Sequence, residues 1–173
     1  MKRLSVIALA LGVLTAGCGS SSSVANPTVS VRPVFTATLS PASENPPIVG
    51  AEASGSGTAT VTFDVTKDAA GNVTASTATF AVTLTGFPAG TPINAAHIHP
   101  GATGVNGGVL LSTALAPGEV VLAAGSGSFT KVVTGVDPAV TQNIINNPAG
   151  FYFNVHSTLN PGGVARGQLV KAP

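Results

Sequence analysis

The sequence predicts an all-β fold, a Greek-key-like antiparallel β-sandwich or flattened barrel with one short helix. The composition holds 21 Gly and 13 Pro beside many Thr and Val, which favours short strands joined by turns over a helical bundle. Apolar and polar residues alternate over residues 58–65 and again over residues 77–84, as expected of strands with one buried face. Between these segments, Gly71-Asn72 is a turn signal, so we expect the two strands to pair as a hairpin.

Further segments have the composition of short strands. They are residues 34–39, 95–99, 108–115, 125–133, 151–157 and 164–170. The alternation predicts that the core contains Phe63, Phe80, Val82, Phe151, Phe153 and Val155. The helix is expected to begin after Asp137, a good N-cap followed by Pro138, and to end at Asn147 before Pro148. The chain of 173 residues is long enough for one domain that buries its own core.

The low charge of the chain excludes one class of partner. Charged residues make up 8% of the sequence, whereas soluble domains contain about 25%. Seven Lys and Arg residues stand against six Asp and Glu residues, for a net charge of +1. A nucleic-acid-binding protein needs a basic stripe to neutralise phosphates. No nucleic acid is therefore expected as a partner.

The first residues have the order of a bacterial lipoprotein signal. The cationic Lys2 and Arg3 precede an apolar run over residues 4–14, and small residues follow up to Cys18, the only cysteine of the chain. The apolar run is shorter than the ~20 residues that span a bilayer, and this order is typical of a cleaved signal peptide. An ordinary secretory signal with an incidental cysteine is the alternative.

This order predicts both the organisation and the location of the protein. We expect residues 1–17 to be a cleaved signal peptide, Cys18 to carry a lipid, residues 18–33 to form a flexible tether and residues 34–171 to form the folded domain. The membrane is then a partner through the lipid on Cys18. The expected location is the bacterial cell envelope, facing the periplasm or the cell exterior.

All three histidines of the chain lie in two short motifs, Ala96-His97-Ile98-His99 and Asn154-Val155-His156. On a strand, His97 and His99 point to the same face, and Ile98 points to the other. Because Val155 is expected in the core, His156 should also point outward. Three neutral imidazoles suit copper or zinc rather than magnesium or calcium. The alternative is that the three histidines are ordinary surface or hydrogen-bonding residues near strand ends.

Two charged residues join this candidate site. If residues 159–163 form a turn centred on Pro161, Arg166 lies opposite His156 on the same face. Arg166 could guide an anion to the metal, pair with a carboxylate such as Glu44, or extend into water. Glu44 could be a further ligand, form a hydrogen bond with an imidazole, or be an ordinary loop residue.

The sequence also resembles a known domain family over nearly all of the expected domain, from about Val34 to Val170. The resemblance rests on motifs in the family's order: residues 35–40 through Glu44-Asn-Pro-Pro47, Ala96-His-Ile-His-Pro-Gly101 with Gly107-Gly108, Phe151-Tyr-Phe-Asn-Val-His156 with Asn160-Pro-Gly-Gly163, and Arg166-Gly-Gln-Leu169. These motifs are similar to those of the CHRD domain, which is repeated in the animal protein chordin and occurs singly in bacterial secreted proteins. The resemblance implies a β domain that works outside the cytoplasm, and it implies no defined activity.

A weaker resemblance concerns the candidate site alone. The order His97, His99, His156 and Arg166 is similar to that in Cu,Zn superoxide dismutases, where a strand His-x-His and a late-strand histidine help to hold copper outside a barrel and an arginine guides superoxide. The chain lacks a bridging histidine, zinc-loop histidines and a disulfide, which excludes a two-metal enzyme. A copper-only or merely copper-binding site remains, and nothing in the sequence establishes turnover.

Two functions therefore remain open. The first is an extracytoplasmic lipoprotein that binds one metal ion, copper favoured, through His97, His99 and His156 for metal handling or redox protection. The second is a non-catalytic interaction module of the envelope that binds no metal. The protein ligands of chordin favour the second by analogy, although a shared fold is a weak basis for function.

Overall fold

The computed structural model describes residues 28–173, which form two antiparallel sheets packed face to face. The six-stranded sheet has the order β11-β2-β3-β4-β8, and β1 pairs with β3 beside it. Its strands are β1 (Val29–Val31), β2 (Val34–Leu39), β3 (Ser56–Lys67), β4 (Val73–Thr85), β8 (Gly127–Thr134) and β11 (Val170–Lys171). The strands β3 and β4 pair directly as the hairpin that the sequence predicts.

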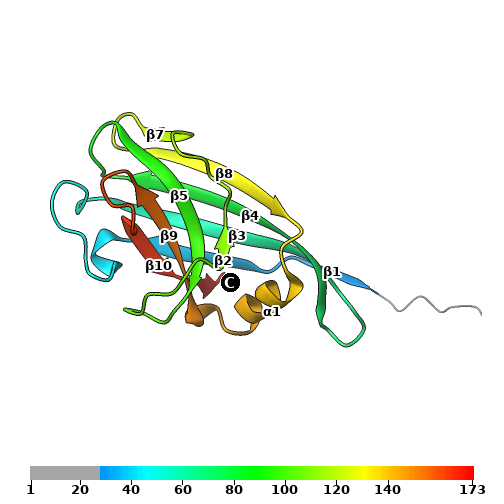
Figure 1. Ribbon diagram of the computed structural model, residues 1–173. Coiled ribbons are helices and arrows are strands. Elements are labelled where there is room, and N and C mark those ends of the chain that lie inside the picture. Colours follow the sequence, from blue (N-terminus) through cyan, green and yellow to red (C-terminus); the bar gives the residue numbers. More distant parts are fainter. Residues whose placement is uncertain (1–27) are drawn as a thin grey trace, which may run out of the picture.

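The five-stranded sheet lies across the first one, as Figure 1 shows for β5, β9 and β10. Its order is β10-β9-β5-β6, and β7 also pairs with β5. Its strands are β5 (Thr91–Pro100), β6 (Leu111–Ser112), β7 (Val120–Leu122), β9 (Phe151–Ser157) and β10 (Ala165–Gln168). Within the described residues the two sheets do not close into a barrel, so the fold is a β-sandwich with a single α-helix.

The core lies between the sheets and contains the side chains expected from the alternation. Phe63, Phe80, Val82, Phe153 and Val155 are buried, and Phe151 is half-buried against them. The rings of Phe80 on β4 and Phe153 on β9 lie 6.0 Å apart. This contact joins the two sheets, so β9 is fixed with its odd-numbered residues facing the core.

The helix α1 (Pro138–Asn146) has the bounds that the sequence predicts. The side chain of Asp137 caps it by accepting a hydrogen bond of 2.8 Å from the backbone N–H of Ala139. The buried Thr141 donates to Ser76 of β4, which holds the helix against the six-stranded sheet. Two short 3₁₀ helices, Pro41–Ser43 and Pro148–Gly150, complete the helical segments of the described residues. None of these helices has the length and apolar character needed to cross a membrane.

Three expectations about the strands are corrected. The segment 108–115 contains only the two-residue β6, and the segment 164–170 divides into β10 and β11, which belong to different sheets. Gly167 lies in the part of the chain that leads from one sheet to the other. A Cβ added at this residue would overlap the carbonyl oxygen of Thr38. The strand β1 lies within residues 18–33 and pairs with β3, so regular structure begins inside the stretch assigned to the tether. The expected signal peptide and Cys18 lie outside the described residues.

Candidate metal centre

The three histidines lie on one face of the five-stranded sheet, the face turned away from the core. His97 and His99 alternate on β5 with Ile98, which is fully buried in the core. On the neighbouring β9, His156 follows the fully buried Val155 and lies opposite Ala95 of β5. The parity of the two strands therefore brings all three imidazoles to the same side, as the sequence predicts.

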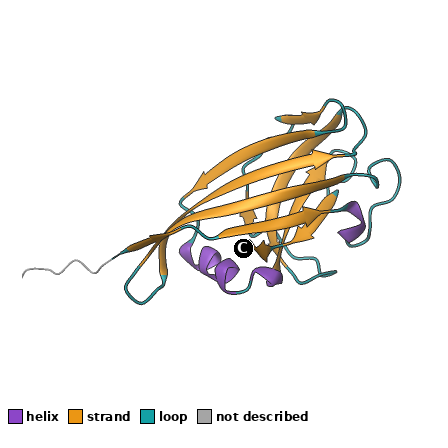
Figure 2. Ribbon diagram, turned by 180° about the vertical axis from the view of Figure 1, so that it is seen from behind, coloured by secondary structure: helices purple, strands orange, loops and turns teal. Residues whose placement is uncertain are grey.

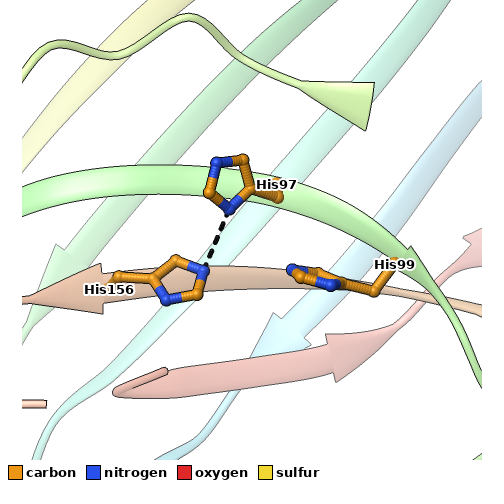
Figure 3. Close-up of side chains that lie close together, drawn as sticks. All are labelled: His97, His99 and His156. Carbon is orange, nitrogen blue, oxygen red and sulfur yellow. Dashed lines mark hydrogen bonds between the residues drawn. The ribbon is translucent and has the colours of Figure 1, made fainter. Parts of the chain in front are cut away.

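The three rings turn toward one space, as Figure 3 shows. One ring nitrogen from each of His97, His99 and His156 lies within 4.8 Å of the other two. The shortest separation joins Nδ1 of His97 and Nε2 of His156, at 3.1 Å. Imidazole nitrogens bind zinc at about 2.0–2.1 Å, so small side-chain rotations would bring all three onto a single ion.

Backbone carbonyls set the direction of two imidazoles. Nδ1 of His99 lies 3.0 Å from the oxygen of Gly107, and Nδ1 of His156 lies 3.0 Å from the oxygen of Pro161. A carbonyl only accepts, so each Nδ1 carries the proton and donates it. Each Nε2 then carries a lone pair, and Nε2 of His99 is buried with no hydrogen-bond partner. This arrangement matches metal-binding histidines, whose second ring nitrogen is held by a carbonyl or carboxylate.

His97 has the opposite arrangement. Because Nε2 of His156 carries a lone pair, Nδ1 of His97 donates the hydrogen bond of 3.1 Å between them. Binding an ion through this Nδ1 requires the proton of His97 to move to Nε2, which changes the tautomer and leaves the ring neutral. The candidate ligand atoms are therefore Nδ1 of His97 and Nε2 of His99 and His156.

The surroundings keep the three imidazoles neutral. Burial, with the neighbouring His156 and His99 in addition, lowers the pKa of His97 to about 4. Burial also lowers the pKa values of His99 and His156, against the hydrogen bonds to Gly107 and Pro161 that raise them. Neutral imidazoles are the form that binds metals, so no proton must be removed from the site at neutral pH.

A row of stacked side chains forms one wall of the site. Tyr152 of β9 lies opposite His99 of β5, and their rings are parallel within 6° at a centroid distance of 5.0 Å. The guanidinium of Arg166 lies 3.9 Å from the centre of the Tyr152 ring. The phenol oxygen of Tyr152 accepts a hydrogen bond from the backbone N–H of Gly107, whose carbonyl holds His99. The sequence analysis did not include Tyr152 or Gly107 in the site. Tyr152 could have been found, because it lies on the same face of the strand as His156, whereas Gly107 has no such sequence signal.

The structure corrects the expected register of Arg166. It lies opposite Asn154, not His156, which is a shift of two residues that leaves it on the outer face. Its side chain is 2% exposed, so it does not extend into water. It donates to Asn106 and to the carbonyl of Val105. The ion pairs found in residues 28–173 do not join it to Glu44. A role in guiding anions stays a prediction, and it would have to act through space.

Glu44 also lies near this face but does not join the group of possible metal ligands. Its side chain is buried beside Asn154 and Gly163, and Oε1 has no hydrogen-bond partner. It therefore forms no hydrogen bond to an imidazole through that oxygen. Burial raises the pKa of its carboxyl to about 7, although Arg166 lowers it through space.

The family of the chain follows from a comparison with family models. The model of the CHRD domain matches residues 35–169. The chain belongs to the CHRD family. The matched CHRD region contains both sheets apart from β1, β11 and the first residue of β2, and it includes all three histidines, Glu44 and Arg166.

Two further comparisons add no relative. Neither the curated proteins nor the solved structures gave a match to the chain. The likeness of this CHRD domain to Cu,Zn superoxide dismutases remains one of residue order.

Proposed function

We propose that this CHRD-domain protein works outside the cytoplasm as a lipid-anchored envelope protein that binds one metal ion, copper favoured, through His97, His99 and His156. Metal handling or redox protection is the role that such a site would serve. The observation that carries the proposal is the convergence of three imidazole nitrogens within 4.8 Å. One of them, Nε2 of His99, is buried with no partner, whereas buried polar atoms are normally hydrogen-bonded. A metal ion would supply the missing partner.

The donor set supports copper over the common alkaline-earth ions. Magnesium and calcium prefer oxygen ligands, and the group contains only imidazole nitrogen. Among first-row divalent ions, copper binds such sites most tightly. Zinc also accepts imidazole ligands. Three protein ligands would leave a position open for water or a small molecule, as in catalytic metal sites.

Two observations support the envelope location. The family of the chain occurs in secreted proteins, and the sequence places Cys18 directly after an apolar run and small residues. A copper site held only by histidines also suits an oxidising compartment, because residues 34–171 contain no cysteine whose thiol could be oxidised.

Metal analysis of the purified protein tests the proposal. Wild type and His97→Ala are each incubated with equimolar copper, passed over a desalting column and assayed for bound metal. Asn94→Ala on the same strand is the control, because Asn94 contacts Thr158 and does not belong to the histidine group. We expect about one copper per chain in wild type and control, and a clear loss in His97→Ala. Equal copper in all three proteins, or none in wild type, would contradict the metal site and favour a metal-free interaction module.

A further inference from the structure

The described residues contain three buried side-chain polar atoms with no hydrogen-bond partner, and all three belong to the same region. They are Nε2 of His99, Oε1 of Glu44 and Oδ1 of Asn154. The proposed metal centre accounts for His99 only. The other two are acceptors, and Glu44 brings a carboxylate, so this second pair lacks a donor or a cation.

Glu44 and Asn154 approach each other at a glycine. Both carboxylate oxygens of Glu44 and the Nδ2 atom of Asn154 lie within 3 Å of the point where a Cβ of Gly163 would stand. Gly163 has a φ of +141°, a conformation that residues with a Cβ rarely adopt. The glycine therefore lets the two side chains lie together beneath the turn that joins β9 and β10. Nδ2 is the end of the Asn154 amide that lies here, so a donor faces the Glu44 carboxylate and the unpartnered Oδ1 is the other end of the amide.

A pocket opens beside this pair. Its volume is about 440 Å³, and its lining includes Glu44, Pro46, Pro47, Asn106 and Pro161, which places it in the size range of small-molecule sites. The prolines offer apolar surface, while Glu44 supplies the one charge among the lining residues.

Hydrogen bonds between two loops hold this pocket in shape. The side chain of Asn45 donates to the carbonyl of Gly104, and Asn106 donates to the carbonyl of Asn45. The pocket is thus built into the fold and does not depend on one free loop.

We propose that this pocket binds a primary alkylammonium group, with the Glu44 carboxylate as its anion and the prolines along the alkyl chain. An ammonium is a compact charge with its three donors on one atom, so it can bond a single carboxylate oxygen. A guanidinium prefers both oxygens of one carboxylate in a planar fork, and Oε1 of Glu44 is buried. Calcium requires six to eight oxygen ligands, more than one carboxylate supplies.

The ammonium could come from a free amine or from a lysine side chain of another protein. Propylamine represents the first source, and Nα-acetyl-lysine-N-methylamide represents the second. Calorimetric titration of each probe into the purified protein, at about pH 8 where Glu44 is largely ionised, measures binding directly. Ethylguanidine and calcium are titrated in parallel.

Three variants make the assignment specific. Glu44→Gln keeps the shape and removes the charge, and we expect it to weaken amine binding at least about tenfold. Glu119→Gln removes the same charge from an exposed residue outside the pocket, and it should bind the amine as wild type does. His97→Ala should lose copper and keep the amine, which separates this site from the metal centre. Copper binding by Glu44→Gln verifies that this variant is folded.

The outcomes divide clearly. Propylamine binding that depends on Glu44 supports a free amine as ligand, and binding of the lysine derivative alone supports a protein side chain; either result supports the ammonium site. Equal binding by wild type and Glu44→Gln, or no binding of either amine, would overturn the ammonium site. Water would then be the partner of Glu44. Tighter binding of ethylguanidine or calcium would also overturn the ammonium assignment.

Discussion

The guanidinium of Arg166 lies 3.9 Å from the centre of the Tyr152 ring, which in turn is parallel to the ring of His99. These residues come from β10, β9 and β5, so the stack runs across three adjacent strands. Arg166 also donates to the loop at Val105 and Asn106. The arginine therefore fastens this loop and the Tyr152 ring over the strand that carries His99.

Arg166→Ala should consequently lower the free energy of unfolding by about 3 kcal/mol, because it removes the charged hydrogen bonds and the ring contact of a buried side chain. Arg32→Ala is the matched control. Arg32 forms an exposed ion pair with Asp64, and such pairs contribute at most about 1 kcal/mol. Urea denaturation followed by circular dichroism measures both values. Equal, small effects of the two substitutions would contradict the fastening role of Arg166.

The core assignment gives a second prediction. Phe80 is fully buried against Phe153 of the other sheet, so Phe80→Ala should cost about 3–5 kcal/mol of stability. Thr79→Ala, one position along on the outer face of β4, should cost well under 1 kcal/mol. Thermal unfolding of the two variants makes the comparison. A Thr79→Ala variant that is as unstable as Phe80→Ala would show that the faces of β4 are wrongly assigned.

Glu44 gives the stability of the protein a specific pH dependence. Burial raises the pKa of its carboxyl from 4.5 to about 7. Between these values the folded state holds a proton that the unfolded state has lost, so this group lowers the free energy of unfolding as the pH rises. Glutamine cannot ionise. As the pH rises from about 4 to about 8, the free energy of unfolding of Glu44→Gln should therefore increase by about 2 kcal/mol relative to that of wild type. Chemical denaturation at each pH measures this difference.

A control with the opposite sign is available for this experiment. The backbone N–H of Ala116, with Lys131 in addition, lowers the pKa of Glu119. Glu119→Gln should therefore lose stability relative to wild type as the pH rises through the acid range. If the difference in stability between Glu44→Gln and wild type does not change with pH, the carboxyl of Glu44 is ordinarily solvated and its pKa is not raised.

The sequence predicted those parts of the fold that depend on local pattern. Alternation of period two identified β3, β4 and β9 and their core faces, because one side of each strand is buried. The Asp137 and Asn147 signals identified the helix ends. The short β6, β7 and β11 depend on pairing with distant strands and have no pattern of their own. Local residues therefore did not reveal β7, and they did not reveal the bounds of β6 and β11.

The sequence predicted which face of the sheet carries the candidate site, but it did not predict the contacts within the site. Strand parity placed His97, His99 and His156 together. The register of Arg166 was wrong because the turn is centred on Asn160, whose carbonyl accepts from both Ser157 and Gly163. Moving the centre from Pro161 by one residue moves each partner by two and keeps the face.

The remaining contacts of the site could not be read from the sequence. The carbonyl of Gly107 that directs His99 comes from a loop, and the stack on Tyr152 requires three strands in register. Such long-range contacts follow from the assembled fold.

Lipidation of Cys18 is a prediction that the described residues do not test. Mass spectrometry of protein from the membrane fraction should find an acylated N-terminal Cys18 and no peptide from residues 1–17. Cys18→Ser should leave the membrane fraction, because a serine offers no thiol for the lipid. Membrane recovery of this variant at the level of wild type would contradict the anchor.

The metal centre is tested most directly by counting the imidazoles bound to copper. Pulsed electron paramagnetic resonance of the protein with one equivalent of Cu²⁺ detects the remote nitrogen of each coordinated ring. We expect three imidazoles in wild type, because one ring nitrogen from each of His97, His99 and His156 lies within 4.8 Å of the other two. In His97→Ala, which should retain little copper, any copper that stays bound should show at most two imidazoles. A wild-type spectrum with fewer than three imidazoles, or the same count after His97→Ala, would contradict the proposed site.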